Sequence, residues 1–327
     1  GIAILIQVFG LSKYIGSRYP IILGSSFAPL APMIMIGNTY GLPTLFGAIM
    51  VSGVLIFLLS FFLDKILMLF PPVVVGTFVT LIGVSLAPTA IQDLAGGVGS
   101  STYGSVQNLL LGFGVLIFII LLGIIGGTVV GAFLGMVDIT PIQEASAFRL
   151  VTPFYFGTPQ FEAGSILIMT IFCIINMIQC IGVFSVLDEI AGTQTDNATK
   201  IKGIKAQAVS QVITGAFNSV PSTMFNENVS LIDLTKIKSR SVIATAGVMM
   251  LLLGIFPKVS AVITVVPKAV LGGATLALFG VITSSGISIL SKLNFFENNN
   301  FTIVGTSIAI GVGATFASDI FAGLPST

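Results

Sequence analysis

Long runs of apolar residues dominate this sequence and leave few choices of fold. Apolar residues make up 55% of the 327 residues and charged residues only 8%, whereas soluble domains have about 25% charged residues. A membrane-spanning helix needs about 17 to 25 predominantly apolar residues, and most of the runs reach that length. The sequence therefore predicts an all-α polytopic membrane protein and excludes a soluble globular domain. The expected segments are residues 1–10, 20–37, 42–63, 72–91, 105–137, 165–187, 205–217, 239–256, 270–290 and 301–317.

The polar composition excludes several kinds of site. His is absent, and the chain has 13 basic against 12 acidic residues. His-based general bases and metal sites are therefore excluded, as is a basic face for nucleic acid. An intramembrane enzyme would need paired carboxylates or a Ser-His pair at membrane depth, and neither is visible, so we expect no enzyme and no cofactor. Cys173 and Cys180 lie seven residues apart in one apolar run and are predicted to be small buried side chains on one helix face.

The basic residues predict the orientation of the chain. Ten of the 13 basic residues fall on one side of the membrane if five loops are placed on that side, namely those near residues 13–18, 65, 200–205, 236–240 and 292. Since basic residues are enriched in cytoplasmic loops, that side should be the cytoplasm. Residues 105–137 must then cross twice, although two helices need about 40 residues. We expect a short basic connection to be missing near Leu122 and Gly123, the alternative being two short tilted helices joined by a Gly turn.

Gly1 opens directly into an apolar run, so we also expect the chain to be truncated at its start.

Two segments carry polar, Gly or Pro residues at membrane depth, namely residues 24–29 and 220–228. Irregular backbone survives there only where protein or a water-filled cavity satisfies it. A shift of 196 places Ser25-Ser26 on Pro221-Ser222, and the same shift places residues 70–76 on residues 266–272. This match suggests an internal duplication, and interrupted segments at corresponding positions of two halves indicate a secondary transporter.

Two polar side chains within these apolar regions are candidate ligand groups. Glu227 lies in the second irregular segment, and a carboxyl group in a membrane costs about 2.5 to 3.5 kcal/mol, which favours a role in ligand or proton handling. Gln179 lies midway along residues 165–187, and its amide suits a planar ligand with alternating C=O and N–H groups. Interhelical hydrogen bonding remains the alternative for Gln179. Asp188 and Glu189, near the end of that run, are predicted to be boundary or gate residues.

Residues 226–236 resemble the signature of the nucleobase/ascorbate transporter family (nucleobase:cation symporter-2). That signature runs Gln or Glu, Asn, any residue, Gly, four residues of any kind, Thr, then Arg or Lys. The match holds at Glu227, Asn228, Thr235 and Lys236 and departs at Ser230, where the family has Gly. Other stretches that look like family segments are residues 24–28, 70–77, 153–157 and 270–274. The resemblance covers essentially the whole chain and is closest to the bacterial xanthine/urate permeases.

The resemblance implies a fold of fourteen segments in two inverted repeats of seven, with a core domain, a gate domain and a short strand beside each of two half-helices. Residues 1–137 would form the first repeat (segments 2 to 7), residues 138–164 an extracellular connection, and residues 165–327 the second repeat (segments 8 to 13). Segments 2–4 and 8–11 would form the core domain, and segments 5–7 and 12–13 the gate domain. Against that plan, we expect the first and last family segments to be missing from this sequence.

The resemblance also implies a binding site. The substrate-binding Glu of family segment eight falls on Gln179, and the polar contact of segment ten falls on Glu227, so the acid and the amide have exchanged places. Glu227 is also the expected residue for proton or ion coupling. The expected substrate-binding residues are Phe27, Ala28, Gln179, Asn226, Glu227 and Asn228.

The implied function is symport of a purine nucleobase such as xanthine or urate, driven by H⁺ or Na⁺, in a multi-pass protein of the inner cell membrane. The bilayer and the small nucleobase are the expected partners, and a homodimer is expected from the family. One alternative is a permease for uracil or another nucleobase. The other is an anion transporter of the related sulfate-transporter fold, although the candidate site offers an acid and no Lys or Arg to an anion.

Overall fold

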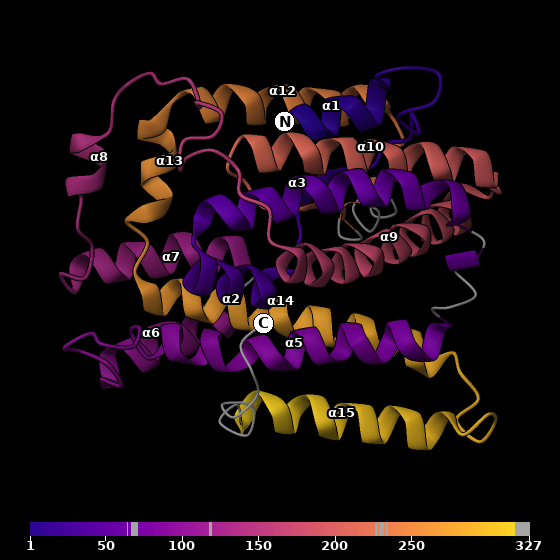
Figure 1. Ribbon diagram of the computed structural model, residues 1–327. Helices are drawn as coiled ribbons and strands as arrows, with labels where there is room; N and C mark the ends of the chain where they lie inside the picture. The colour runs from indigo at the N-terminus through magenta and orange to yellow at the C-terminus, as the bar shows by residue number, and fades with distance from the viewer. Residues whose placement is uncertain are drawn as a thin grey trace. The chain divides into compact units, whose positions relative to one another are not determined.

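The computed structural model describes residues 1–63, 65–66, 71–117, 120–225, 228, 232 and 235–317. Helices account for most of the chain, and the strands within the described residues are β1 and β2 (Figure 1). The elements of the first half are α1 (Ile2–Phe9), β1 (Leu23–Ser25), α2 (Leu30–Tyr40), α3 (Leu42–Leu59), η1 (Ser60–Phe62), α5 (Pro72–Leu94), α6 (Val106–Ile117), α7 (Ile120–Phe133) and α8 (Thr140–Glu144). Those of the second half are α9 (Ala163–Ala191), α10 (Asn197–Ala216), β2 (Ser222–Met224), α12 (Arg240–Ile255), α13 (Pro257–Thr264), α14 (Lys268–Ser291) and α15 (Asn300–Phe316).

Several described helices have the length and composition of membrane spans, which confirms the predicted class. They are Leu42–Phe62, Pro72–Leu94, Ala163–Asp188 and Lys268–Ser291, and the bent pair α12 and α13 adds a fifth if it is taken as one span. α6, α7 and α15 are apolar but shorter. The predicted end of one helix was wrong where charged residues precede the apolar run. α10 begins at Asn197, eight residues before the expected segment 205–217.

The region 105–137 forms the two short helices α6 and α7, of 12 and 14 residues, which pack against each other. The break between them falls at residues 118–119, outside the described residues. Leu122 and Gly123, where we expected a missing connection, lie inside α7 instead. A missing segment in this region stays a prediction.

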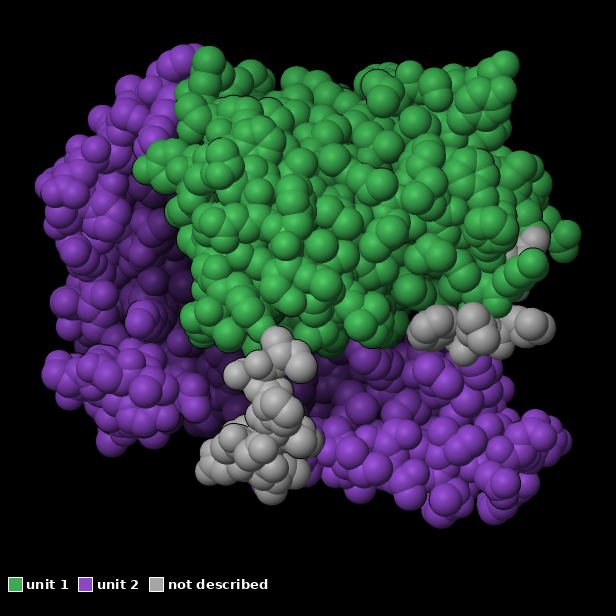
Figure 2. All heavy atoms as spheres, in the orientation of Figure 1, with its two compact units in different colours: residues 1–70, 150–255 green, residues 71–149, 256–327 purple. Residues whose placement is uncertain are grey.

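The chain folds into two compact units, each assembled from both halves of the sequence (Figure 2). Unit 1 contains residues 1–70 and 150–255, and unit 2 contains residues 71–149 and 256–327. Each unit therefore takes one stretch from the first expected repeat and one from the second. The assignment of core and gate roles to these units stays a prediction.

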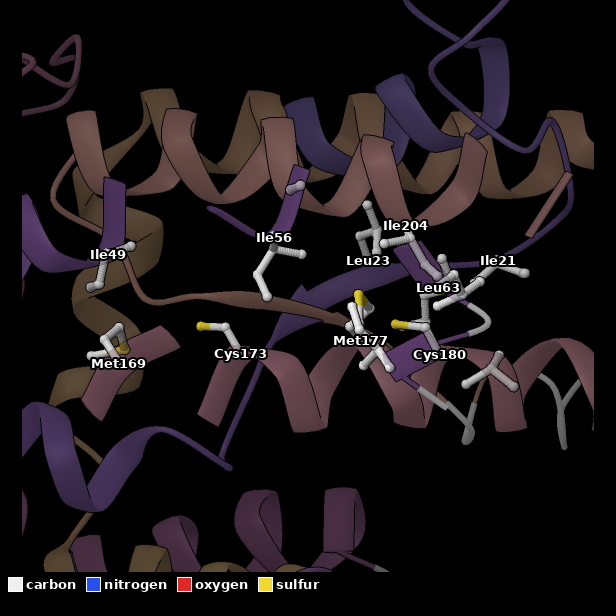
Figure 3. Close-up of a cluster of buried hydrophobic side chains, with 14 of the residues drawn as sticks. Ile21, Leu23, Ile49, Ile56, Leu63, Met169, Cys173, Met177, Cys180 and Ile204 are labelled. Carbon is white, nitrogen blue, oxygen red and sulfur yellow. The ribbon is translucent and has the colours of Figure 1, made fainter. Parts of the chain in front are cut away.

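In unit 1, α3 packs against α9 and α10, and their contact surface forms a large apolar core. Figure 3 shows Cys173, Met177 and Cys180 along one side of α9 within this core. Both cysteines are free thiols with no exposed surface, which confirms the prediction of small buried side chains. A polar contact joins the three helices inside the core, where Gln211 Nε2 donates to Ser52 Oγ at 2.7 Å and to Cys173 Sγ at 3.0 Å.

The burial of both thiols predicts their reactivity. We expect Cys173 and Cys180 to remain unmodified by N-ethylmaleimide in the native protein, because a fully buried thiol is inert, and to react completely in SDS. Mass spectrometry of the intact protein would count the modified sites. A Ser101→Cys variant, whose residue is exposed in the loop after α5, should react in the native state. Labelling of the native thiols as fast as that control would contradict the packing of α9.

In unit 2, α5 and α14 pack closely and run antiparallel. Both helices begin directly after a Pro, Pro71 and Pro267, which are the residues matched by the shift of 196. Their contacts repeat under the same shift, since Gly76 lies against Leu290 and Gly272 lies against Leu94. The packing therefore has the approximate two-fold symmetry that inverted repeats impose.

Candidate functional site

The two interrupted segments of the sequence meet in unit 1 through a pair of short strands. β1 pairs with β2 in antiparallel register, with Leu23 opposite Met224, Gly24 opposite Thr223 and Ser25 opposite Ser222. The pairing continues beyond the strands, because Ser26 N donates to Pro221 O at 2.8 Å and Phe225 N donates to Ile22 O at 3.1 Å. Backbone groups that would otherwise be unpaired at membrane depth are thus satisfied between the two segments. This confirms the strands expected beside the half-helices.

Helix α9 forms the third side of this arrangement. Asn176, fully buried on α9, accepts a hydrogen bond from Ser26 Oγ at 2.9 Å, and Ser26 Oγ in turn accepts the N–H of Ala28 at 3.2 Å. Gln179 lies one turn further along α9 and is half-buried. Residues three or four apart share one face of a helix, so Asn176 and Gln179 are neighbours beside the loop that precedes α2.

The predicted ligand groups of the first segment lie at the start of α2. Phe27 is half-buried and Ala28 is buried, and both immediately precede Pro29, the N-cap of α2. The backbone N–H of Ala28, an expected substrate-binding residue, donates to Ser26 Oγ within this loop. A ligand at this helix N-terminus would have to share that N–H with the serine.

The second segment is described only in part. Asn226, Glu227 and Ser230 lie outside the described residues. Asn228 is 5% exposed, and its Nδ2 donates to Pro20 O at 2.9 Å. Since Pro20 precedes β1, this contact is a second tie between the two segments. The role of Asn228 in substrate binding stays a prediction.

The last two residues of the signature, Thr235 and Lys236, lie among the described residues. Thr235 and Lys236 are exposed, and Thr235 Oγ1 accepts the N–H of Ile237 at 3.3 Å. Lys236 has a positive φ of 57°, a conformation that few non-Gly residues adopt. These residues belong to the turn that leads into α12.

Asp188, predicted to be a boundary residue, anchors the loop between α9 and α10. Its carboxylate accepts the N–H of Thr195 at 2.9 Å and the hydroxyls of Thr195 and Thr193. Thr195 Oγ1 also contacts Tyr19 Oη at 3.3 Å, on the segment that leads to β1. The interaction network fixes the end of α9, which agrees with a structural role at the end of the helix.

Three buried polar atoms at or near the strand pair have no hydrogen-bond partner in the described structure. They are Nδ2 of Asn176, Oγ of Ser222 and Oγ1 of Thr223, whose residues are 0%, 3% and 8% exposed. Asn176 is not among the ligand groups predicted from the sequence. An Asn in the middle of an apolar run was the available signal, because a buried amide needs partners that hydrophobic neighbours do not supply.

Comparison with known proteins finds relatives along nearly the whole chain. The model of the Permease family matches residues 1–320. The chain is 39% identical over 341 residues to the xanthine permease of Bacillus subtilis, covering 100% of this chain and 78% of that protein. It is 41% identical over 346 residues to the uric acid permease PucJ of the same species, covering 100% and 77%. A uracil permease of that species is 29% identical, covering 91% and 75%.

A solved structure supports the fold. The transmembrane domain of a cyanobacterial bicarbonate transporter, BicA, superposes with a TM-score of 0.70, covering 92% of this chain and 84% of that one at 16% sequence identity. At this identity the likeness concerns the fold alone, which is that of a transporter transmembrane domain. The family match over nearly every residue, the relatives at about 40% identity and this fold lead to one conclusion: the chain belongs to the permease family that was recognised from its signature, nucleobase:cation symporter-2.

Proposed function

We propose that this protein transports a purine nucleobase, xanthine or urate in first place, across the cell membrane. The observation that carries the proposal is the identity of 39% and 41% over the whole chain to relatives named for xanthine and uric acid, against 29% to a uracil permease. The contact between Ser26 and Asn176 supports it, since Ser26 precedes Phe27 and Asn176 lies one turn before Gln179 on α9. Uracil is the second candidate substrate.

In this proposal the base lies between the loop before α2 and the face of α9 that carries Gln179. The amide of Gln179 donates to and accepts from the edge of the base, and Phe27 flanks its face. Glu227 supplies the one carboxylate expected in the site, where it accepts N–H groups of the base and couples transport to H⁺ or Na⁺. Movement of one domain against the other then gives alternating access, as is general for secondary transporters.

The anion-transporter alternative has only the fold in its favour. The structural neighbour is named for bicarbonate, and an anion site normally presents Lys, Arg or helix N-termini. Residues 20–29 and 220–228, which form the strand pair and its flanks, contain no Lys or Arg. The N-terminus of α2 is therefore the one anion-attracting feature among the described residues of these segments. With no basic side chain beside it, the site chemistry favours a planar, hydrogen-bonding base over an inorganic anion.

Uptake of labelled xanthine tests the proposal. Cells that lack their own nucleobase permeases and express this protein should take up xanthine saturably. Unlabelled urate should compete well and uracil less well, whereas bicarbonate should not compete. A collapse of uptake on addition of a protonophore, with no response to Na⁺, would identify H⁺ as the coupling ion. Absence of uptake of any nucleobase by protein shown to be in the membrane would reject the proposed function.

A further inference from the structure

A chain of hydrogen bonds fixes the orientation of the Asn176 side chain. Ser26 Oγ accepts the N–H of Ala28 at 3.2 Å and donates its own proton to Asn176 Oδ1 at 2.9 Å. The oxygen of the amide therefore faces Ser26, and the NH₂ group is the end that points away from it. Because Asn176 lies in the middle of α9 and Ser26 lies between β1 and α2, this contact connects two elements 150 residues apart in sequence.

The NH₂ group at the end of this chain of hydrogen bonds has no partner among the described residues. Asn176 is 0% exposed, and Nδ2 has no hydrogen-bond partner in the described structure. Buried polar groups in native proteins are nearly always paired, and each exception requires an explanation such as a ligand or a water molecule. Leaving both donors unpaired in a low-dielectric interior is costly, so a donor of this kind calls for an acceptor that the described residues do not supply.

The position of Asn176 limits what that acceptor can be. It lies one turn before Gln179 on the same face of α9 and is tied to the loop that contains Phe27 and Ala28. We infer that Asn176 is a further substrate-contacting residue, whose Nδ2 donates a hydrogen bond to a carbonyl oxygen of the base. This inference rests on the proposed function and adds a determinant of substrate specificity. Asn176 recognises one oxo group of the substrate.

Ligands that differ by one oxo group test the assignment. Xanthine carries oxygens at C2 and C6, hypoxanthine lacks the one at C2, and 2-hydroxypurine lacks the one at C6. Binding of each to the purified full chain in detergent would be measured by titration of the ligand-induced rise in melting temperature. Leaving a donor unpaired weakens binding by about 5- to 150-fold, so wild type should disfavour one of the two deletions by a factor in that range.

The Asn176→Leu variant removes the donor and keeps the branched shape of the side chain. We expect it to bind xanthine and the disfavoured analogue with nearly equal affinity, because the group that distinguishes them is gone. Asn176→Ser, which leaves more space and a smaller donor, provides the same comparison if the Leu variant does not fold. Asn108→Leu is the matched control: Asn108 is 1% exposed in unit 2 and also has one unpaired amide atom, Oδ1. It should lower the melting temperature without changing the affinity ratio.

The outcomes separate the inference from the proposed function. An affinity ratio that collapses in the Asn176 variants and persists in the Asn108 control supports the inference. A ratio that is unchanged in the Asn176 variants, or a uniform loss of affinity for all three ligands, shows a structural role or a bound water and overturns it. If wild type binds no nucleobase at all, the proposed function fails and the inference fails with it.

Discussion

Replacement of Glu227 by Gln is expected to reduce xanthine uptake by about 10- to 100-fold, because a hydrogen bond to a charged group contributes about 1.5 to 3 kcal/mol. Glu227 lies outside the described residues, so the expectation rests on the sequence. It is the acid of the family signature, and its partner position, Gln179, carries an amide where the family has Glu. The variant would leave two amides and no carboxylate at these positions, and a symporter of this kind would lose both a substrate contact and its coupling group.

A double exchange makes this prediction more specific. The variant Glu227→Gln with Gln179→Glu restores the arrangement that is typical of the family, with the acid on α9 and the amide in the signature. We expect it to recover a large part of the lost uptake, since one carboxylate would again be present. Initial rates of uptake, corrected for the amount of protein in the membrane, would measure both variants. Uptake by Glu227→Gln above half that of wild type would contradict a role for this carboxylate in coupling.

Substitution of Gly272 by Val is expected to prevent unit 2 from packing as observed. A Cβ atom at Gly272 would lie 2.0 Å from the backbone N of Leu94 and 2.5 Å from the carbonyl carbon of Asp93. Backbone atoms cannot rotate away as the end of a side chain can, so α5 and α14 would have to separate. Overpacking of this kind costs about 1 to 3 kcal/mol and more where the surroundings cannot yield, and we expect the upper end of that range.

The control for this prediction lies on the same helix. Gly280 is exposed on α14, and a Cβ there would meet nothing within 4 Å. Gly280→Val should therefore be tolerated, while Gly272→Val should lower the yield of monodisperse protein and its melting temperature in detergent. Size-exclusion chromatography with a thermal melt would compare the two. Equal behaviour of both variants would show that the helix contact at Gly272 is looser than described.

Much of the fold could be predicted because duplication leaves a trace in the sequence. The shift of 196 matched residues 25–26 with 221–222 and Pro71 with Pro267, and both matched pairs belong to elements that contact each other in the structure. Related segments meet because a two-fold axis between repeats brings equivalent elements together. Family resemblance then supplied the strands, whereas the position of the site on segments near residues 27, 179 and 227 stays a prediction.

The remaining features could not be predicted because membrane helices give little information about which face is buried. Lipid-facing and protein-facing residues are both apolar, so the sequence of α9 did not show that Cys173 and Cys180 face α3 and α10. The contact of Ser26 with Asn176 spans 150 residues, and that of Asn228 with Pro20 spans 208. Such pairs depend on tertiary packing, and neither periodicity nor local propensity encodes them.

The pairing of β1 with β2 has a consequence for the order in which the protein is made. β1 ends at Ser25, and its partner strand begins at Ser222, so β1 emerges from the ribosome well before the strand that completes it. At roughly 5 to 20 residues per second, the interval is about 10 to 40 s. During that time the unpaired edge of β1 must be satisfied by water, by the insertion machinery or by α1, which contacts β1 in the finished structure. The strand pair is therefore completed late in biosynthesis, after most of the helices of unit 1 have been synthesised.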